Sequence, residues 1–544
     1  MAYENYSQLR VLVVDDFMQF LTSIKRMLEE LGVVKIDIAL SSSQALQFCD
    51  GPAYDVVLCD YNLGDDVKNG LHVLEAIREK RAIRHHTMFV LVTAETSKEV
   101  VLATYDEEPD AYLTKPFNYK MLYQRLNRIL LRRDEMKPVF SALEKNELKQ
   151  AIQCCEKKSE MTGRFQVDFK KLLCDLYLKN KNYDLAEMLL KKVLDERPLD
   201  WAKISYARVK VALGEFEVAT DNLKDLIRSN KFCLQAYDIL IDVYEATGET
   251  EKKQKILKEV TDVSPLSILR QKRLGEVAQV NNDMGTAATA YLRCVQVGKH
   301  SCHKAPEDYM ELGRTTAAML AESNGDMERH SQKTLEALSG VSSQFGSDSN
   351  RDTQLLLVQS RIYSGLKNET KSVSMLKKAE ELIRQNSDIL DVKTKLDWAQ
   401  AISSNGEKER ADKLLRELVM EYQDDEKALS EIDKHLAEPK SKANRMKIAS
   451  INREGVGFYN DKKYAESINL FKYAARLFPK HVGIRLNLVQ AILGDLEAGD
   501  RTLDRRGLCL EILNSVSEEI PDSDRQGVRY AHLRDKFDKL ERLF

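Results

Sequence analysis

Residues 11–16 read VLVVDD, four apolar residues followed by two acids. A short run of this kind is typical of a strand that is covered on both faces of a parallel sheet. The segment VVLCD at residues 56–60 repeats the pattern. Five strands are expected in all, at residues 11–14, 35–40, 55–59, 88–92 and 111–113. Amphipathic stretches such as 17–31 separate them, so residues 8–132 are predicted to form an α/β domain with a five-stranded parallel sheet.

The strand-like runs stop after the charged stretch 132–137 and Pro138, and helical periodicity then continues to residue 544. We predict a linker at 133–140, helical repeats over 141–437, a break at 438–446, and further repeats with capping helices over 447–544.

The helical region repeats with a period of about 34 residues. The segment 168–198 has the pattern of two paired helices, with Ala186 at a packing position. Ala219 lies about one period after Ala186, and Pro265 lies about two periods after Pro198. This pattern resembles the tetratricopeptide repeat (TPR), which implies an all-α solenoid that binds another protein.

The composition limits the classes of partner. The 83 Lys and Arg residues balance 86 Asp and Glu residues, and the formal charge of −3 gives no global attraction for nucleic acid or anionic lipid. The nine cysteines show no framework spacing, which favours reduced thiols. The opening residues lack the pattern of a signal peptide, and no apolar run is long enough to cross a bilayer. We expect a cytoplasmic protein with no membrane insertion and no direct contact with nucleic acid.

Acidic residues stand at the ends of two of the expected strands. Asp15 and Asp16 follow the first strand, and Asp60 ends the third. Ligands of open α/β sheets gather outside the carboxyl ends of the strands, so these side chains should converge. Three crowded carboxylates require a hard divalent cation, and Mg²⁺ is the natural candidate.

Two further polar residues follow the later strands. Thr93 comes at the end of the fourth strand and Lys115 just after the fifth. A threonine hydroxyl and a lysine ammonium suit the stabilisation of phosphoryl oxygens. Pro116 is expected to fix the conformation of the loop after Lys115. The sequence leaves open whether the Lys115-Pro116 peptide bond is cis or trans.

Taken together, these residues resemble the signature of CheY-like receiver domains, which have a flavodoxin-like fold. The resemblance covers residues 8–132 and implies that Asp60 accepts a phosphoryl group from a sensor histidine kinase or a phosphotransfer protein. The resemblance implies that Asp15, Asp16, Asp60 and the backbone carbonyl of Asn62 bind Mg²⁺. It implies that Thr93 and Lys115 contact the phosphoryl oxygens and that Thr93 and Tyr112 act as a switch pair. It also implies that Asn62 and Glu95 tune the rate of dephosphorylation.

One segment departs from the family pattern. The loop after Asp60 reads YNLGDDVKNG, with Gly64 where the family usually has proline and Gly70 about two positions late. The departure removes no ligand, but it puts the kinase specificity and the rate of dephosphorylation in doubt.

Other candidate sites receive structural interpretations. His300, Cys302 and His303 in the run KHSCHK match no standard zinc spacing. His330 and His435 are expected to be solvated helical histidines rather than phosphotransfer residues. The adjacent Cys154 and Cys155 are expected to serve helix packing.

The leading functional hypothesis is a bacterial-type two-component response regulator. Phosphorylation at Asp60 would rearrange the last helices and strand of the receiver and alter how the repeats bind a protein, such as the kinase, another response regulator or an effector of the same pathway. The alternatives are a phosphate sink or constitutive adaptor that competes for a sensor kinase, and a degenerate enzymatic output domain. No enzymatic activity is expected apart from phosphoryl acceptance and self-dephosphorylation, and the sequence leaves open whether phosphorylation promotes or blocks binding.

Overall fold

A computed structural model describes residues 3–51, 53–64, 69–79, 87–94, 109–301, 303–322, 327–386, 390–499, 503–517 and 525–541. The chain divides into two compact units. The first comprises Met1–Val277 and Thr289–Asp308, and the second comprises Ala278–Ala288 and Tyr309–Phe544.

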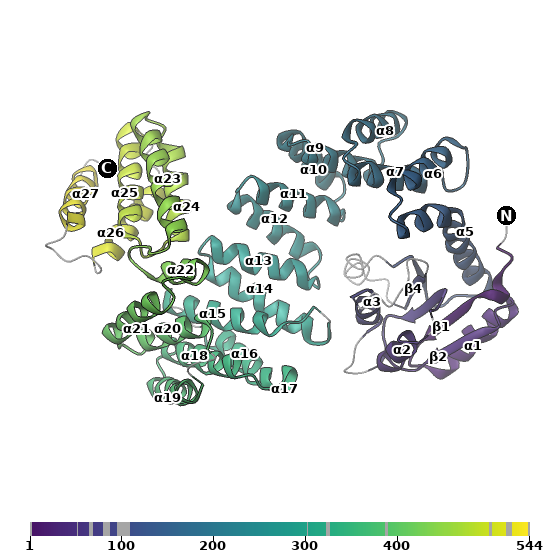
Figure 1. The fold of residues 1–544 in the computed structure, drawn as a ribbon, viewed down its shortest axis with the longest axis horizontal. Coiled ribbons are helices and arrows are strands. Elements are labelled where there is room, and N and C mark those ends of the chain that lie inside the picture. Colours follow the sequence, from purple (N-terminus) through teal and green to yellow (C-terminus); the bar gives the residue numbers. More distant parts are fainter. Residues whose placement is uncertain are drawn as a thin grey trace. The chain divides into compact units, whose positions relative to one another are not determined.

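The N-terminal part of the first unit contains the parallel sheet that the sequence predicts (Figure 1). Its strands lie in the order β2-β1-β3-β4-β5, and every neighbouring pair is parallel. The order reverses between β1 and β3, which is the topology of a doubly wound, flavodoxin-like sheet. The strands are β1 Arg10–Val14, β2 Lys35–Ala39, β3 Val56–Asp60, β4 Met88–Thr93 and β5 Ala111–Thr114.

Helices cover both faces of this sheet. On one face, α1 (Met18–Glu30) and the first half of α5 (Tyr119–Glu144) form a core with the odd-numbered residues of β1. On the other face, α2 (Ser42–Cys49) and α3 (Gly70–Glu79) pack against the even-numbered residues. The strands are therefore apolar on both sides, as their sequences predict.

Local signals in the sequence set the helix ends. The hydroxyl of Ser41 accepts a hydrogen bond from the backbone N–H of Gln44 at the start of α2, and Asn118 caps α5 in the same way. Gly32, with a φ of 92°, ends the turn after α1 at the position predicted for a helix stop.

The helix α5 runs without interruption from the sheet domain into the helical region. Its first turns pack against the sheet through Leu122, Leu126 and Leu130, and its last turns join a separate core through Met136 and Val139. Pro138 lies inside the helix. Residues 133–140, expected to form the linker, are thus helical.

Helices account for the remaining described residues outside turns and loops. They are α6 Leu148–Glu160, α7 Gln166–Lys179, α8 Tyr183–Glu196, α9 Asp200–Ala212, α10 Phe216–Ser229, α11 Leu234–Ala246, α12 Thr250–Val263, α13 Ile268–Val280, α14 Met284–Val297, η2 Gly298–His300, α15 Pro306–Glu322, α16 Glu328–Ser339, α17 Val341–Phe345, α18 Ser349–Gly365, α19 Glu369–Gln385, α20 Val392–Ser404, α21 Lys408–Glu421, α22 Glu426–Ile432, η4 Asp433–His435, α23 Lys442–Asn460, α24 Tyr464–Leu477, α25 Val482–Ala498, α26 Leu503–Ser517 and α27 Arg525–Glu541. The 3-10 helix η1 (Tyr6–Gln8) precedes the sheet.

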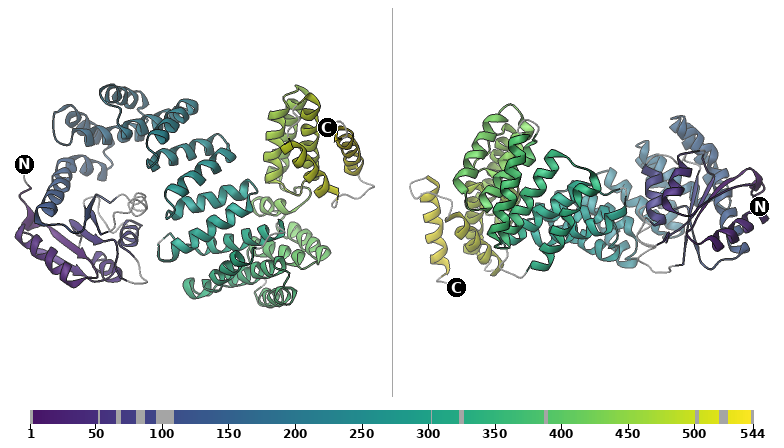
Figure 2. Two further views of the ribbon diagram at one scale, coloured as in Figure 1. Left: turned by 180° about the vertical axis from the view of Figure 1, so that it is seen from behind. Right: turned by 90° about the horizontal axis from the view of Figure 1, so that it is seen from below.

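The helices from α7 to α12 are arranged in successive hairpins (Figure 2). Helices α7, α9, α11 and α13 begin at equal intervals along the chain, at Gln166, Asp200, Leu234 and Ile268. The short turns inside these hairpins each contain a residue with positive φ, at Lys181, Gly214, Gly248 and Asn282. The interval between helix starts agrees with the repeat period that the sequence predicts.

Small residues allow paired helices to approach closely. A Cβ atom on Gly275 would lie 2.7 Å from the ring of Tyr291, and one on Gly455 would lie 2.5 Å from the ring of Phe471. Both contacts are shorter than a real Cβ allows. Glycine is therefore required by packing at these two helical positions, in agreement with the small-residue positions of the predicted repeats.

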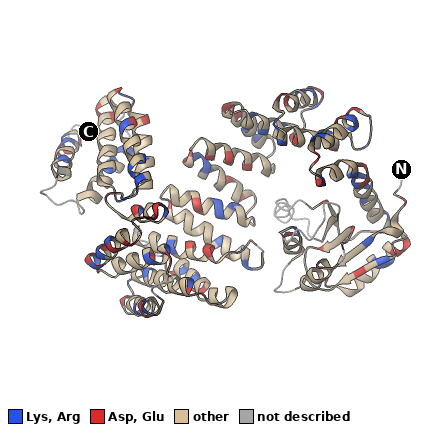
Figure 3. Ribbon diagram, in the orientation of Figure 1, with Lys and Arg blue, Asp and Glu red and all other residues tan. Residues whose placement is uncertain are grey.

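Charged residues of both signs are intermixed along the helices (Figure 3). Among the described residues, no helix combines the length and the apolar character that would be needed to span a membrane.

Candidate functional site

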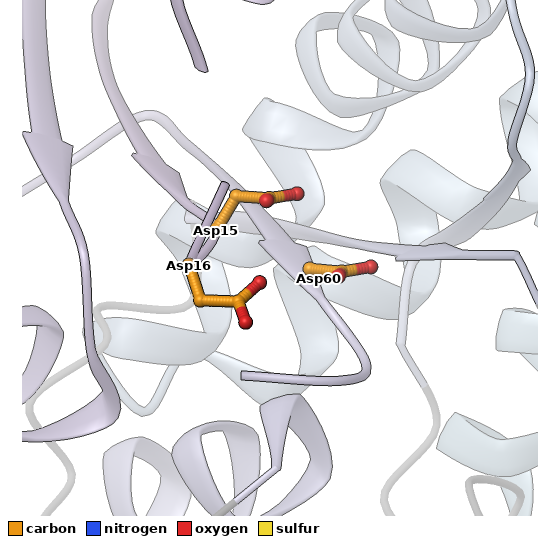
Figure 4. A group of neighbouring side chains, drawn as sticks. All are labelled: Asp15, Asp16 and Asp60. Carbon is orange, nitrogen blue, oxygen red and sulfur yellow. The ribbon is translucent and has the colours of Figure 1, made fainter. Parts of the chain in front are cut away.

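The acidic residues predicted from the sequence converge at the carboxyl ends of β1 and β3 (Figure 4). One carboxylate oxygen from each of Asp15, Asp16 and Asp60 lies within 4.8 Å of the others. Asp15 and Asp60 are 1% and 6% exposed, whereas Asp16 is open to solvent. Two buried acids and one exposed acid therefore share one small space.

Lys115 is the cation of this site. Its Nζ lies 2.7 Å from Oδ2 of Asp15 and 2.9 Å from Oδ2 of Asp60. In the loop that carries it, the backbone N–H of Lys115 donates to the carbonyl of Thr93, and the Lys115-Pro116 peptide bond is cis. Lys115 thus pairs with two of the three carboxylates.

Burial dominates the electrostatics of Asp60. The pKa of Asp60 is raised to about 6, mainly by loss of hydration and also by the nearby Asp15. The Lys115 ammonium and the backbone N–H of Tyr61 lower it. The carboxyl group of Asp60 therefore favours a bound cation more strongly than an exposed aspartate would.

Thr93 and Tyr112 occupy neighbouring strands. Thr93 ends β4 and is buried, and Tyr112 lies on β5, half-buried against the core that contains α2 and α3. Their strands pair directly, with Leu91 opposite Tyr112 and Thr93 opposite Thr114. Asn62 follows Asp60 by two residues and is exposed. Glu95 lies outside the described residues.

The loop after Asp60, which departs from the family pattern, ends at Gly70. Gly70 opens α3, and its backbone N–H donates to the carbonyl of Tyr61 over 2.8 Å. A Cβ atom on Gly70 would lie 2.1 Å from the carbonyl oxygen of Asp60, so glycine is required at this position. Gly64 has a φ of 92°, a backbone conformation that glycine adopts without strain.

Aromatic residues around Lys115 were not predicted as part of the site. Its ammonium lies 4.2 Å from the ring centre of Phe20, and Phe20 in turn packs edge-to-face against Phe117. A cation held against an aromatic face has fewer positions open to it. Phe117 lies two residues after Lys115 in the sequence, so its position near the site could have been predicted. Phe20 is distant in the sequence, and only the fold brings it to the site.

The two candidate histidines of the helical region lie elsewhere. His330 and His435 were expected to be solvated, but both are half-buried: His330 lies 3.4 Å from the hydroxyl of Thr316, and both ring nitrogens of His435 lie 3.3 Å from Nε2 of Gln400. Thr316 and Gln400 lie on other helices, so the pattern of the helix that carries each histidine does not indicate these contacts.

Cys59 directly precedes Asp60 on β3. Cys155 is buried in a helical core, and the eight described cysteines are free thiols. Cys302, in the run KHSCHK, lies outside the described residues.

Comparisons with known proteins agree on the N-terminal domain. Residues 11–127 match the family model described as the response regulator receiver domain. The chain is 26% identical to the chemotaxis protein CheY of Pseudomonas aeruginosa over 124 residues, which cover 23% of this chain and 98% of CheY. It is 27% identical to chemotaxis protein CheY-3 of Vibrio cholerae over 124 residues, covering 23% of this chain and 93% of that protein.

Solved structures match over the same part of the chain. The BeF3-activated receiver domain of DrrB is 31% identical and covers 23% of this chain and 98% of its own, with a TM-score of 0.20. The response regulator TrrA of Thermotoga maritima in complex with Mg(2+)-BeF is 31% identical and covers 23% of this chain and 100% of its own, with a TM-score of 0.20.

Proposed function

The N-terminal domain of this chain is a CheY-like receiver domain, and we propose that it accepts a phosphoryl group on Asp60. The observation that carries this proposal is the position of Lys115, whose ammonium contacts both Asp60 and Asp15 at the mouth of a three-carboxylate cluster. The phosphoryl group would come from a sensor histidine kinase or a phosphotransfer protein.

The proposed reaction is a transfer between a histidine and an aspartate. A carboxylate oxygen of Asp60 attacks the phosphorus of a phosphohistidine, the new O–P bond forms, and the N–P bond breaks as the imidazole leaves and takes up a proton. The hydroxyl of Thr93 donates to a phosphoryl oxygen, and Lys115 neutralises another. Hydrolysis of the acyl phosphate by water returns Asp60 to its carboxylate, at a rate that Asn62 and Glu95 would tune.

The site fits a Mg²⁺ ion. Three carboxylate oxygens within 4.8 Å of one another are the hard ligands that this ion prefers. Asp15, Asp16, Asp60 and the backbone carbonyl of Asn62 would hold it. When bound, Mg²⁺ would neutralise charge on the phosphoryl oxygens.

We propose that the helical region is a TPR-type array that binds another protein. The equal intervals between the starts of α7, α9, α11 and α13 support this assignment, since a length of about 34 residues is typical of that repeat. The partner would be the sensor kinase, another response regulator or an effector protein in the cytoplasm. Phosphorylation of Asp60, with Thr93 and Tyr112 moving together, would change the affinity of the array for this partner.

A pull-down from the host cytoplasm tests this function. Wild-type protein and Asp60→Ala are each used with and without Mg²⁺ and beryllofluoride, a mimic of the phosphoryl group. We expect a partner whose recovery changes with beryllofluoride only in the wild type. If beryllofluoride and the Asp60→Ala substitution both leave the recovery of the partner unchanged, phosphorylation-dependent binding is contradicted. The protein would then be a constitutive adaptor or a phosphate sink.

A further inference from the structure

The loop between α14 and α15 interrupts the regular spacing of the hairpins. Helices α7, α9, α11 and α13 start at equal intervals, but α15 starts at Pro306, later than the same interval after Ile268 would place it. The extra residues fall in the segment 298–305, which contains the run KHSCHK. Insertions in helical repeats form surfaces outside the packed core, often on a binding face. We call the described residues 298–301 and 303–305 of this segment the 298–305 loop.

The C-terminal end of the 298–305 loop is tied to α13. Lys272 of α13 forms an ion pair of 2.7 Å with the buried Asp308, whose Oδ2 also accepts from the backbone N–H of Ala305. This end of the loop is thereby held in a defined position.

The centre of the loop contacts the receiver domain. The hydroxyl of Ser301 donates to Oε2 of Glu75 over 2.7 Å, although the two residues are 226 positions apart. Ser301 is 1% exposed and Glu75 is 7% exposed, and both belong to the first compact unit. Both side chains are buried, so this hydrogen bond forms away from solvent and contributes to the contact.

Glu75 lies on the helix that begins at the backbone of Asp60. Gly70, the first residue of α3, is so close to the Asp60 carbonyl oxygen that a Cβ atom there would lie 2.1 Å from it. Asn69 and His72 exchange hydrogen bonds across this start, with Asn69 N–H donating to Nδ1 of His72 and His72 N–H donating to Oδ1 of Asn69. A shift of the Asp60 backbone is therefore passed to α3, which carries Glu75 about 7.5 Å further along its axis.

We propose that the face of α3 around Glu75 holds the 298–305 loop of the same chain while Asp60 is unphosphorylated, and that phosphorylation weakens this contact. The inference rests on the proposed phosphorylation of Asp60 and deepens it by naming the surface that reports it. The contact occurs in a structure in which Lys115 pairs with Asp60 and Asp15. A phosphoryl group would form the ion pair with Lys115 in place of the carboxylates, and it would make the side chain of Asp60 larger. We expect these changes to displace the backbone of Asp60, against which Gly70 is packed. This proposal adds α3 as a surface that reports phosphorylation, beside the last helices and strand expected from the sequence.

Thermodynamic linkage gives this proposal a second, independent consequence. If phosphorylation weakens the contact, then loss of the contact must strengthen binding of a phosphoryl mimic by the same factor. Couplings of this kind are typically about 5- to 150-fold in affinity. A contact that merely packs two parts of the chain would leave the affinity for the mimic unchanged.

The experiment uses the full chain with Mg²⁺ and beryllofluoride. Hydrogen exchange of the 298–305 loop is followed in the wild type, in Ser301→Ala, and in the control Ser343→Ala, whose exposed hydroxyl donates to the local carbonyl of Gly340. We expect beryllofluoride to speed exchange in the wild type and the control. In Ser301→Ala the 298–305 loop should exchange rapidly even without beryllofluoride.

The reciprocal measurement is the affinity for beryllofluoride, followed by the fluorescence of a dye attached near the receiver site or by protection of β3 and β4. We expect Ser301→Ala to bind it at least about 5-fold more tightly than the wild type, and Glu75→Gln to lie between them. Equal affinities in Ser301→Ala and wild type, or an unchanged loop when beryllofluoride is bound, would overturn the proposal. If the wild type binds no beryllofluoride at all, the proposed phosphorylation fails as well, and the two failures are thereby distinguished.

Discussion

The ammonium group of Lys115 lies 2.9 Å from Oδ2 of Asp60, the proposed phosphoryl acceptor. This ion pair neutralises a buried carboxylate before transfer and is in position to contact the phosphoryl oxygens during it. We therefore predict that Lys115→Gln lowers the rate of phosphorylation by acetyl phosphate at least about 100-fold, the typical effect of losing one stabilising donor. The rate is followed by mass spectrometry of the intact chain. Lys120→Gln, on the exposed side of α5, should keep the wild-type rate, and Asp60→Asn should take up no phosphoryl group.

Removal of Mg²⁺ should destabilise the receiver domain. Three carboxylates share a small space with one lysine, so a bound cation relieves their repulsion. At a Mg²⁺ concentration of about 100 times its Kd, the ion should add ~2.7 kcal/mol to the free energy of unfolding. Thermal unfolding with EDTA and with Mg²⁺ measures the effect. Asp16→Asn should reduce the shift strongly, and Asp50→Asn, outside the cluster, should leave it intact; an equal shift in both variants would argue against this site.

Two neighbouring glycines in α23 should respond to alanine in opposite directions. A Cβ atom on Gly455 would lie 2.5 Å from the buried ring of Phe471, so Gly455→Ala should lower the free energy of unfolding by about 1–3 kcal/mol. A Cβ atom on Gly457 would meet nothing within 4 Å. Gly457→Ala should therefore stabilise the helix by up to ~1 kcal/mol. Hydrogen exchange of α23 and α24 in the full chain compares the two, and destabilisation by both variants would refute the packing argument.

The second compact unit should lose stability in weak acid because of His435. The pKa of His435 is lowered to about 4, mainly by burial and also by the cations Lys480, Arg361 and Lys434, against a smaller opposing effect of Glu431. An unfolded histidine titrates near ~6.5, so between these values the unfolded chain binds more protons than the folded one. The stabilising contribution is thus complete above pH ~6.5 and is lost as the pH falls towards 4, by about 2 kcal/mol.

Hydrogen exchange around η4, corrected for the intrinsic pH dependence, measures this loss. His435→Gln should flatten the profile between pH 6.5 and 4. The exposed His532 provides the matched control, because His532→Gln should keep the wild-type profile. A profile that is already flat in the wild type would show that protonation of His435 costs nothing.

The receiver fold was predictable because its signals are local. The run VLVVDD and the segment ending in Asp60 each combine a doubly covered strand with acids at its carboxyl end, and parallel strands bring such ends together. The regular spacing of the hairpins was likewise visible in the positions of Ala186 and Ala219. A repeat of about 34 residues can be recognised from the spacing of residues along the sequence, without knowledge of contacts between distant segments.

Contacts between distant segments were not predictable. Nothing in the sequence near Phe20 indicates that its ring lies beneath Lys115, and nothing near Glu75 indicates Ser301. The burial of His435 depends on helices that are far away along the chain, so its helical pattern suggested solvent instead. The run KHSCHK matches no standard zinc spacing, and nothing in it indicates that Ser301 forms a hydrogen bond with Glu75 of the receiver domain.

The continuity of α5 also constrains how this protein could have changed during evolution. Its two halves belong to separate cores, so the border between the receiver and the helical region falls inside a single helix. Inserting or deleting one residue there would rotate one core against the other by about 100° and shift it by ~1.5 Å. Such a joint tolerates substitution far better than a change in length. The exchange of output regions by recombination, which a flexible linker permits, would here have to preserve the helical phase.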